Sequence, residues 1–176
     1  NAGGRIGSAE TGVELLMSEK MSSVEYLSEK LSKYNNERKQ IERQLASSII
    51  KNINSNSRII CVYGEKWHQG VIGIVASKIT QKFHKPVIVI SLEKDLGKGS
   101  CRSIKGFNMG KMIKEAKDQG ILISGGGHEM AAGLLIERKK IHLLSKFVDD
   151  YPFIDDFDKM SKYFDIELDI ININRE

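Results

Sequence analysis

One long helical pattern dominates the first third of the chain, and it constrains the fold more than any other feature. Across residues 22–53, apolar side chains recur at intervals of three and four, interrupted once by Arg38. This is the period of one face of an α-helix. Ser22 and Glu25 have the spacing of a capping box, which predicts where the helix begins. At 1.5 Å per residue, such a helix would extend about 45 Å.

From residue 58 onward, short apolar runs alternate with helical stretches. Strands are predicted at 58–63, 87–92, 97–104, 121–124 and 134–137, and helices at 70–83, 109–119 and 139–151. Because the third run contains several glycines, we expect it to be a weakened strand or a sheet edge. The order β-α-β-β-α-β-β-α predicts an α/β fold with a mixed β-sheet flanked by helices.

The two ends of the chain have their own patterns. Residues 1–7 are expected to form a glycine-rich loop, followed by a short helix with Ser8 as its N-cap. Residues 153–163 are acidic and irregular, whereas residues 164–173 alternate apolar and acidic side chains, as in a half-buried strand. Because a lone strand is unstable, we expect it to join this sheet or to begin a further β domain.

The composition narrows the class of protein. Apolar and charged fractions of 40% and 28% are typical of a soluble globular protein, and the net charge of +4 permits a nucleic-acid partner without requiring one. Cys61 and Cys101 form neither a disulfide framework nor zinc spacing, which favours a reducing compartment such as the cytoplasm. We find no apolar run of about 20 residues and no signal peptide, so no membrane association is expected. Since Asn1 lies inside a motif, we expect a piece of a longer protein.

A glycine-rich segment around His128 is the first candidate site. Three consecutive glycines, of which Gly126 and Gly127 precede the histidine, allow the backbone to approach a ligand closely. Backbone N–H groups in such a loop can bind an anion, and His128 can contact a phosphate near neutral pH. The alternative is a plain turn in which the histidine has a structural role.

A second candidate site lies at residues 99–103, Gly-Ser-Cys-Arg-Ser. If this segment is extended, Ser100 and Arg102 share one face, about 7 Å apart along the strand, and Ser103 points the other way. A hydroxyl beside a guanidinium suits a terminal phosphate. The alternative is an edge strand that is kept polar against aggregation.

Two further clusters contain candidate residues. Arg5 follows two glycines and can present its guanidinium to a phosphate without steric hindrance, or it is a surface arginine at a helix entry. Trp67 and His68 lie between a predicted strand and helix, where α/β sheets bind ligands. Trp67 can stack on a base, which is worth about 1–3 kcal/mol. The alternative is a buried Trp–His pair that fixes the loop.

The carboxylates are scattered along the chain. A phosphodiester hydrolase usually clusters carboxylates around divalent metal ions. Here the densest acidic run, residues 149–158, is better explained as a solvated linker, and His128 has no second ligand at a suitable spacing. We therefore expect no metal to be bound by this chain alone.

Taken together, the clusters resemble the RecJ family of single-stranded-DNA-specific exonucleases, in the DHH phosphoesterase superfamily. The matching segments occur in order: NAGGRIG at 1–7, WHQGVIGIVAS at 67–77, GSCRS at 99–103 and GGHEMAAG at 126–133. The last segment fits any DHHA1 domain, whereas WHQGVIG is more specific to RecJ. The chain departs from the family pattern at Lys66, where glycine is common, and at Gly3, where alanine is common.

The resemblance implies an organisation for the chain. Residues 1–57 would be a linker region with a long interdomain helix, residues 58–151 a DHHA1 substrate-binding domain, and residues 152–176 an acidic linker with the first strand of a truncated OB-fold-like domain. A DHH domain that binds Mn²⁺ or Mg²⁺ would precede Asn1. The stripe of the long helix would then pack on that missing domain.

The resemblance also implies a function and roles for residues. The whole protein would be a 5′→3′ exonuclease of DNA repair and recombination, a monomer served by a single-stranded-DNA-binding protein and a helicase. Arg5, Ser100 and Arg102 would bind the 5′ phosphate, and His128 would position the substrate. Trp67 and His68 would support the site, and Ser103, Gly126 and Gly127 are included among its candidate residues.

Two other interpretations stay open at this point. The first is a related phosphodiesterase that acts on short oligonucleotides or cyclic dinucleotides, because the glycine–histidine segment is shared with those enzymes. The second is a non-catalytic module that dimerises as a coiled coil through residues 22–53. Arg38 interrupts the seam that such a coiled coil would need.

Overall fold

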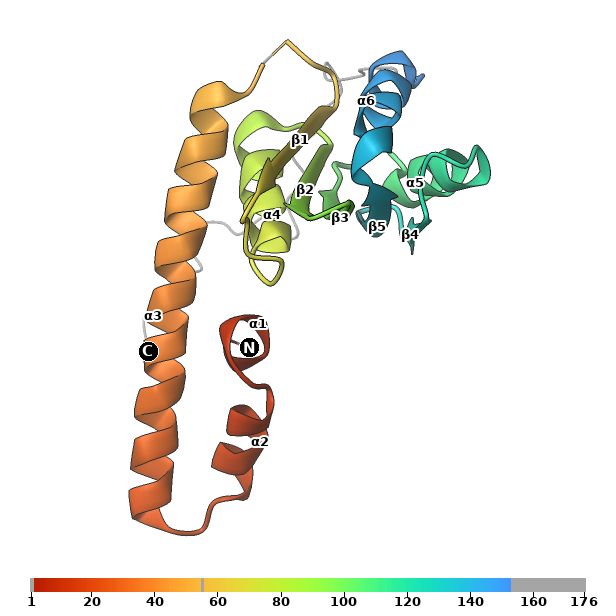
Figure 1. The fold of residues 1–176 in the computed structure, drawn as a ribbon. Helices are drawn as coiled ribbons and strands as arrows, with labels where there is room; N and C mark the ends of the chain where they lie inside the picture. Colours follow the sequence, from red (N-terminus) through yellow and green to blue (C-terminus); the bar gives the residue numbers. More distant parts are fainter. Residues whose placement is uncertain (1, 55, 153–176) are drawn as a thin grey trace, which may run out of the picture.

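A long helix stands beside an α/β domain (Figure 1). The computed structural model describes residues 2–54 and 56–152. The acidic segment at 153–163 and the strand expected at 164–173 lie outside these residues. In the described parts of the chain, no helix is long and apolar enough to span a membrane.

Three helices make up the N-terminal part: α1 (Gly3–Ile6), α2 (Glu10–Met17) and α3 (Met21–Asn52). The expected glycine-rich loop is wrong, because residues 3–6 close one helical turn. The capping box is also wrong: Lys20 is the N-cap of α3, and Ser22 already lies in its first turn. The N-cap of α2 is Ala9, one residue after the expected Ser8, although the Ser8 hydroxyl does accept a hydrogen bond from the N–H of Glu10 at 3.1 Å.

The apolar stripe of α3 is covered in large part by the chain's own helices. A Cβ on Gly7 would lie 2.7 Å from the ring of Tyr34, so the backbone after α1 rests directly on that ring. Farther along, Leu45, Ala46 and Ile49 pack into a cluster with α4 (Ile72–Phe83). This differs from the expectation that the stripe packs on a missing domain.

An ion-pair network joins α3 to α4. Glu42 is buried and pairs with Arg38 on its own helix and with Lys78 on α4. Burial disfavours the charged carboxylate, but hydrogen bonds and charge from Lys78 and Arg38 outweigh it, so the pKa of Glu42 lies below its usual value. Arg38, which interrupts the apolar pattern, therefore supports the carboxylate that makes the interhelical pair with Lys78.

The predicted order of elements in the α/β domain is confirmed. The elements are β1 (Ile60–Glu65), α4, β2 (Val87–Glu93), β3 (Leu96–Arg102), α5 (Met109–Asp118), β4 (Ser124–Gly127), β5 (Ala131–Glu137), a 3-10 turn (Arg138–Lys140) and α6 (Ile141–Asp150). The strands lie in the order β1-β2-β3-β5-β4, with β1 and β2 parallel and the other pairs antiparallel. The sheet is therefore mixed, as expected.

Of the two expectations for β3, a weakened strand or a sheet edge, the second is wrong, because β3 lies at the centre of the sheet between β2 and β5. Its glycines make room for large side chains of the neighbouring strands. A Cβ on Gly97 would lie 2.9 Å from Ile90 and 3.0 Å from Ile136, and one on Gly99 would lie 2.6 Å from Leu134. The glycines therefore belong to core packing, where the sequence alone suggested a weak strand.

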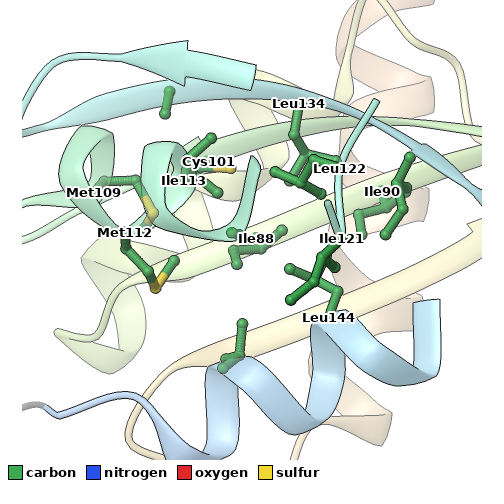
Figure 2. Packing of buried hydrophobic residues seen from close by; sticks show 14 of the residues in the cluster. Ile88, Ile90, Cys101, Met109, Met112, Ile113, Ile121, Leu122, Leu134 and Leu144 are labelled. Carbon is green, nitrogen blue, oxygen red and sulfur yellow. The ribbon is translucent and has the colours of Figure 1, made fainter. Parts of the chain in front are cut away.

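The expected strand at 121–124 is also misplaced. Ile121 and Leu122 enter the core (Figure 2), and the glycine run itself forms β4, the edge strand that pairs with β5. A Cβ on Gly127 would lie 2.3 Å from the carbonyl oxygen of Ala131. The tight connection between β4 and β5 thus requires glycine at this position.

Two apolar clusters cover the two faces of the sheet. On one face, α5 and α6 pack over Ile88, Ile90 and Cys101 (Figure 2). On the other face, α4 and the C-terminal half of α3 cover Val87 and Val89. The second face of the sheet, under the start of α4, is where the candidate site lies.

Candidate phosphate-binding site

Three of the predicted site residues, Arg5, Ser100 and Arg102, line one open pocket of about 460 Å³. The pocket is formed by α1, the turn before α4, the first turn of α4 and β3. Its other lining residues are Gly4, Gln69, Gly70, Ile72, Gly73, Lys98 and Gly99. The fold thus brings together cations from two segments that are far apart in the sequence.

Arg5 is fixed at this pocket because α1 sits on the turn that leads into α4. Its Nη1 donates a hydrogen bond to the carbonyl oxygen of Gly70 at 3.1 Å. A Cβ on Gly70 would lie only 2.2 Å from the carbonyl oxygen of Arg5, so no other residue type fits this contact. Gly70 therefore makes the approach of α1 possible.

Arg102 is held in a defined orientation on β3. Its Nε donates to the hydroxyl of Ser77 at 3.1 Å, and its Nη1 donates to the hydroxyl of Ser100 at 3.2 Å and to the carbonyl oxygen of Cys101 at 2.7 Å. Ser100 and Arg102 share the face of β3 that looks toward α4, whereas Cys101 is buried on the other face. The alternation expected from the sequence is thus present.

The first turn of α4 also lines the pocket. A Cβ on Gly73 would lie 3.0 Å from the Ser100 hydroxyl and 3.2 Å from Nη2 of Arg102, so glycine lets the helix come close to both groups. In the first turn of α4, the N–H groups of Ile72, Ile74 and Val75 already donate to the carbonyl oxygens of His68 and Val71, which leaves, among the described residues of this turn, the N–H of Gly73 for a ligand. Together with the helix dipole, it favours an anion at this position.

The charged side chains that line the pocket are all positive. Arg5, Lys98 and Arg102 are cationic, and no aspartate or glutamate lines the pocket in the part of the chain that the structure describes. Lys98 was not predicted as a site residue from the sequence, although it is two residues before Ser100 on the same strand face. Extending the alternation of β3 by one step would have found it.

Trp67 and His68 lie beside this pocket and shape the turn before α4. The indole rests on Gly64, where a Cβ would lie 2.4 Å from its Cε2, and packs with the cluster around α4. The His68 Nδ1 accepts from the N–H of Gly70 at 3.1 Å, and its carbonyl oxygen accepts from the N–H of Val71 at 2.9 Å. These contacts hold the turn, but they differ from the expected buried pair, because Trp67 is half-buried and His68 is exposed.

Ser103 lies on the other side of the sheet. It is buried, its hydroxyl donates to the carbonyl oxygen of Phe107 at 2.7 Å, and its N–H donates to that of Met130 at 2.9 Å. The structure therefore separates it from Ser100 and Arg102. Its hydrogen bonds fix the segment before α5 to the connection between β4 and β5.

His128, Gly126 and Gly127 form a separate group at the edge of the sheet. The N–H of His128 donates to the carbonyl oxygen of Ala131 at 2.8 Å, so this N–H is not directed toward an anion. The imidazole is exposed. Since Ala131 pairs with Arg102, the histidine lies at the same end of the sheet as the pocket arginine, with β5 between them.

The chemistry of the remaining candidate ligands is limited. Within residues 2–54 and 56–152, no group of three or more His, Cys, Asp or Glu side chains is arranged to hold a metal ion. Burial raises the pKa of Cys61 to about 12 and raises that of Cys101 as well, so both remain thiols at neutral pH. The described site thus consists of three cations, the Ser100 hydroxyl and the backbone N–H of Gly73, which suit a phosphate.

Comparisons with known proteins agree with this architecture. RecJ of Bacillus subtilis, named a single-stranded-DNA-specific exonuclease, is 38% identical over 146 residues, which are 80% of this chain and 18% of that protein. RecJ of Escherichia coli, with the same description, is 34% identical over 156 residues, which are 83% of this chain and 27% of that protein. The chain thus spans about a quarter or less of these relatives.

Solved structures match the fold over most of the chain. An exonuclease RecJ bound to manganese matches with a TM-score of 0.82 and 26% identity, over 92% of this chain and 41% of that one. RecJ of Thermus thermophilus in complex with Mg²⁺ matches with a TM-score of 0.79 and 27% identity, over 85% of this chain and 23% of that one. The DHHA1 domain model matches residues 56–151, more than half of the sequence. The chain therefore belongs to the DHHA1 domain family.

Proposed function

We propose that this chain is the DHHA1 part of a single-stranded-DNA-specific 5′→3′ exonuclease, and that its pocket binds the 5′ phosphate of the DNA. The observation that carries the proposal is the convergence of Arg5, Lys98, Ser100 and Arg102 on the first turn of α4. A terminal phosphate monoester has a charge of about −1.5 to −2 at pH 7, more than the single charge of an internal diester. Three cations without a lining carboxylate favour the terminal group.

The hydrolysis itself is assigned to other parts of such a protein. The support is that the chain spans 18% and 27% of the two RecJ relatives compared above, and that solved RecJ structures contain Mg²⁺ or Mn²⁺. Such metal ions activate a water molecule and stabilise the phosphodiester that it attacks. This chain would hold the 5′ end, while His128, exposed at the same end of the sheet as Arg102, would position the following nucleotide.

The biological setting follows from the same proposal. We infer a cytoplasmic role in DNA repair and recombination, with a single-stranded-DNA-binding protein and a helicase as partners and a monomeric protein as the acting form. Residues 1–57, 58–151 and 152–176 would be the linker region, the substrate-binding domain and the start of a further β domain. The packing of α1, α2 and α4 along α3 supports a strut rather than a coiled coil.

Substitution of the pocket arginine tests the proposal. Arg102→Ala should weaken binding of 5′-phosphorylated single-stranded DNA about tenfold or more, because a hydrogen bond to a charged group contributes about 1.5–3 kcal/mol. Binding of the 5′-hydroxyl form should change little. Arg43→Ala, on the exposed side of α3, is the matched control. An unchanged preference for the phosphorylated end in Arg102→Ala would refute the assignment of this pocket.

A further inference from the structure

Ser77 contacts the pocket arginine without lining the pocket itself. It lies on α4, one helical turn after Gly73, and its hydroxyl meets Nε of Arg102 at 3.1 Å. The same hydroxyl donates to the carbonyl oxygen of Gly73 at 3.1 Å. Ser77 therefore connects the backbone of the first turn of α4 with the side chain that faces it.

The donor and acceptor assignment of this hydroxyl is fixed by its partners. A serine hydroxyl has one proton and two lone pairs. Because the proton goes to the Gly73 carbonyl oxygen, a lone pair is available for the N–H of Arg102 Nε. A guanidinium has only donors, so Ser77 can meet it in no other way.

This contact determines which edge of Arg102 is available to a ligand. The guanidinium is planar, so a hydrogen bond at Nε and two at Nη1 fix the orientation of its whole plane. Nη2 is then directed toward Gly73, at the first turn of α4. There it can act on the same anion as the N–H group of Gly73.

We propose that Ser77 is a positioning residue for Arg102, and that it thereby sets the preference of the pocket for a terminal phosphate. This inference rests on the proposed function. Without the hydroxyl, Nε of a half-buried arginine loses its acceptor, and the guanidinium, then held through Nη1 alone, can turn out of the plane in which Nη2 faces the first turn of α4. The charge stays in the pocket, but its geometry is lost.

A purely structural role for Ser77 would have a different consequence. Serines in helices often bond to a carbonyl oxygen of the preceding turn, and such bonds have little effect on stability. Ser48 on α3 is an example, since its hydroxyl donates to the carbonyl oxygen of Leu45 at 2.8 Å. If Ser77 did no more than this, its substitution would leave phosphate binding unchanged.

The experiment compares the dissociation constants of 5′-phosphorylated and 5′-hydroxyl pentathymidylate for the whole chain and its variants. Ser77→Ala should raise the dissociation constant of the phosphorylated form about fivefold and leave that of the hydroxyl form unchanged. Ser77→Thr, which keeps the hydroxyl, should restore most of the binding, and Ser48→Ala should match the unsubstituted protein. In NMR spectra, the Nε–H signal of Arg102 should shift in Ser77→Ala and return in Ser77→Thr.

Two comparisons separate this inference from the proposed function. If Arg102→Ala abolishes the preference for the phosphate and Ser77→Ala does not, the inference is wrong and the proposed function stands. If the unsubstituted chain has no such preference, the proposed function fails, and the inference with it. In the Arg102→Ala background, Ser77→Ala should have no further effect; a full fivefold loss there would show that Ser77 acts independently of the arginine.

Discussion

At the scale of single residues, Gly73 controls how closely α4 approaches β3. Its backbone is helical, and a Cβ would lie 3.0 Å from the Ser100 hydroxyl and 3.2 Å from Arg102 Nη2. Both neighbours are ends of side chains, so an added methyl group would displace them rather than the backbone. The conformation of the helix itself does not require glycine here, so the binding site is what the methyl group would disturb.

Gly73→Ala should therefore separate stability from binding. Alanine is favoured over glycine inside a helix by about 0.5–1 kcal/mol, so the free energy of unfolding should stay the same or rise. Affinity for 5′-phosphorylated DNA should fall about fivefold or more, because Ser100 and Arg102 lose their positions.

Denaturant unfolding and titration with phosphorylated DNA measure the two effects. Gly12→Ala on α2 is the control, because a Cβ there meets nothing within 4 Å. Unchanged affinity in Gly73→Ala would mean that Ser100 and Arg102 do not need their observed geometry.

Residue patterns predicted part of the site. Alternation along an extended segment placed Ser100 and Arg102 on one face, and the structure has them there. The contribution of Ser77 was not accessible, because it depends on how α4 lies over β3. Trp67 and His68 are residue types that often bind ligands. In the structure they contact Gly64, Gly70 and Val71, and these contacts depend on the fold of the turn, which the sequence pattern does not give.

At the scale of elements, periodicity gave the order of strands and helices, because each period is local. The position of a strand in the sheet is not local. The glycines of β3 suggested a sheet edge. In the structure they leave room for large side chains of β2 and β5, the strands that pair with β3 on its two sides. The glycine run before His128 suggested a loop, yet it pairs as β4. A glycine in the sequence thus indicates that another group lies close to the backbone, but it does not indicate which group this is.

The contact between α3 and α4 gives a pH-dependent prediction. The pKa of Glu42 is lower in the folded protein than in the unfolded chain, because Lys78 and Arg38 outweigh the effect of its burial. Its ionisation therefore stabilises the fold above the unfolded pKa of about 4.3, and this contribution is lost as the pH falls through the lower, folded pKa.

Glu42→Gln should reduce the free energy of unfolding by about 1–2 kcal/mol at pH 7, less than for a fully buried pair because the Lys78 side chain is 45% exposed. The difference from the unsubstituted protein should shrink as the pH falls below about 4. Urea unfolding at several pH values measures it. Glu37→Gln, exposed on the same helix, is the control. A deficit that stayed constant down to acidic pH would contradict the role of the charge.

At the scale of the whole molecule, α4 connects the two parts of the structure. Its outer side packs on α3 and carries Lys78, while its N-terminal turn lines the pocket and its Ser77 contacts the pocket residue Arg102. Since α1 also packs on α3 and lines the pocket, these two helices together set the position of the pocket relative to the long helix. In the proposed exonuclease, this packing would fix the position of the bound 5′ end of the DNA relative to α3.

The most direct test locates the phosphate on the chain. In NMR titrations, a 5′-phosphorylated trinucleotide should shift the amide signals of Gly73, Ser100 and Arg102, while its 5′-hydroxyl form shifts them far less. A cyclic dinucleotide, which has no terminal phosphate, should behave like the hydroxyl form. Equal shifts from all three ligands, or shifts centred on Gly126 and His128 with the pocket unaffected, would contradict a 5′-phosphate site at the start of α4.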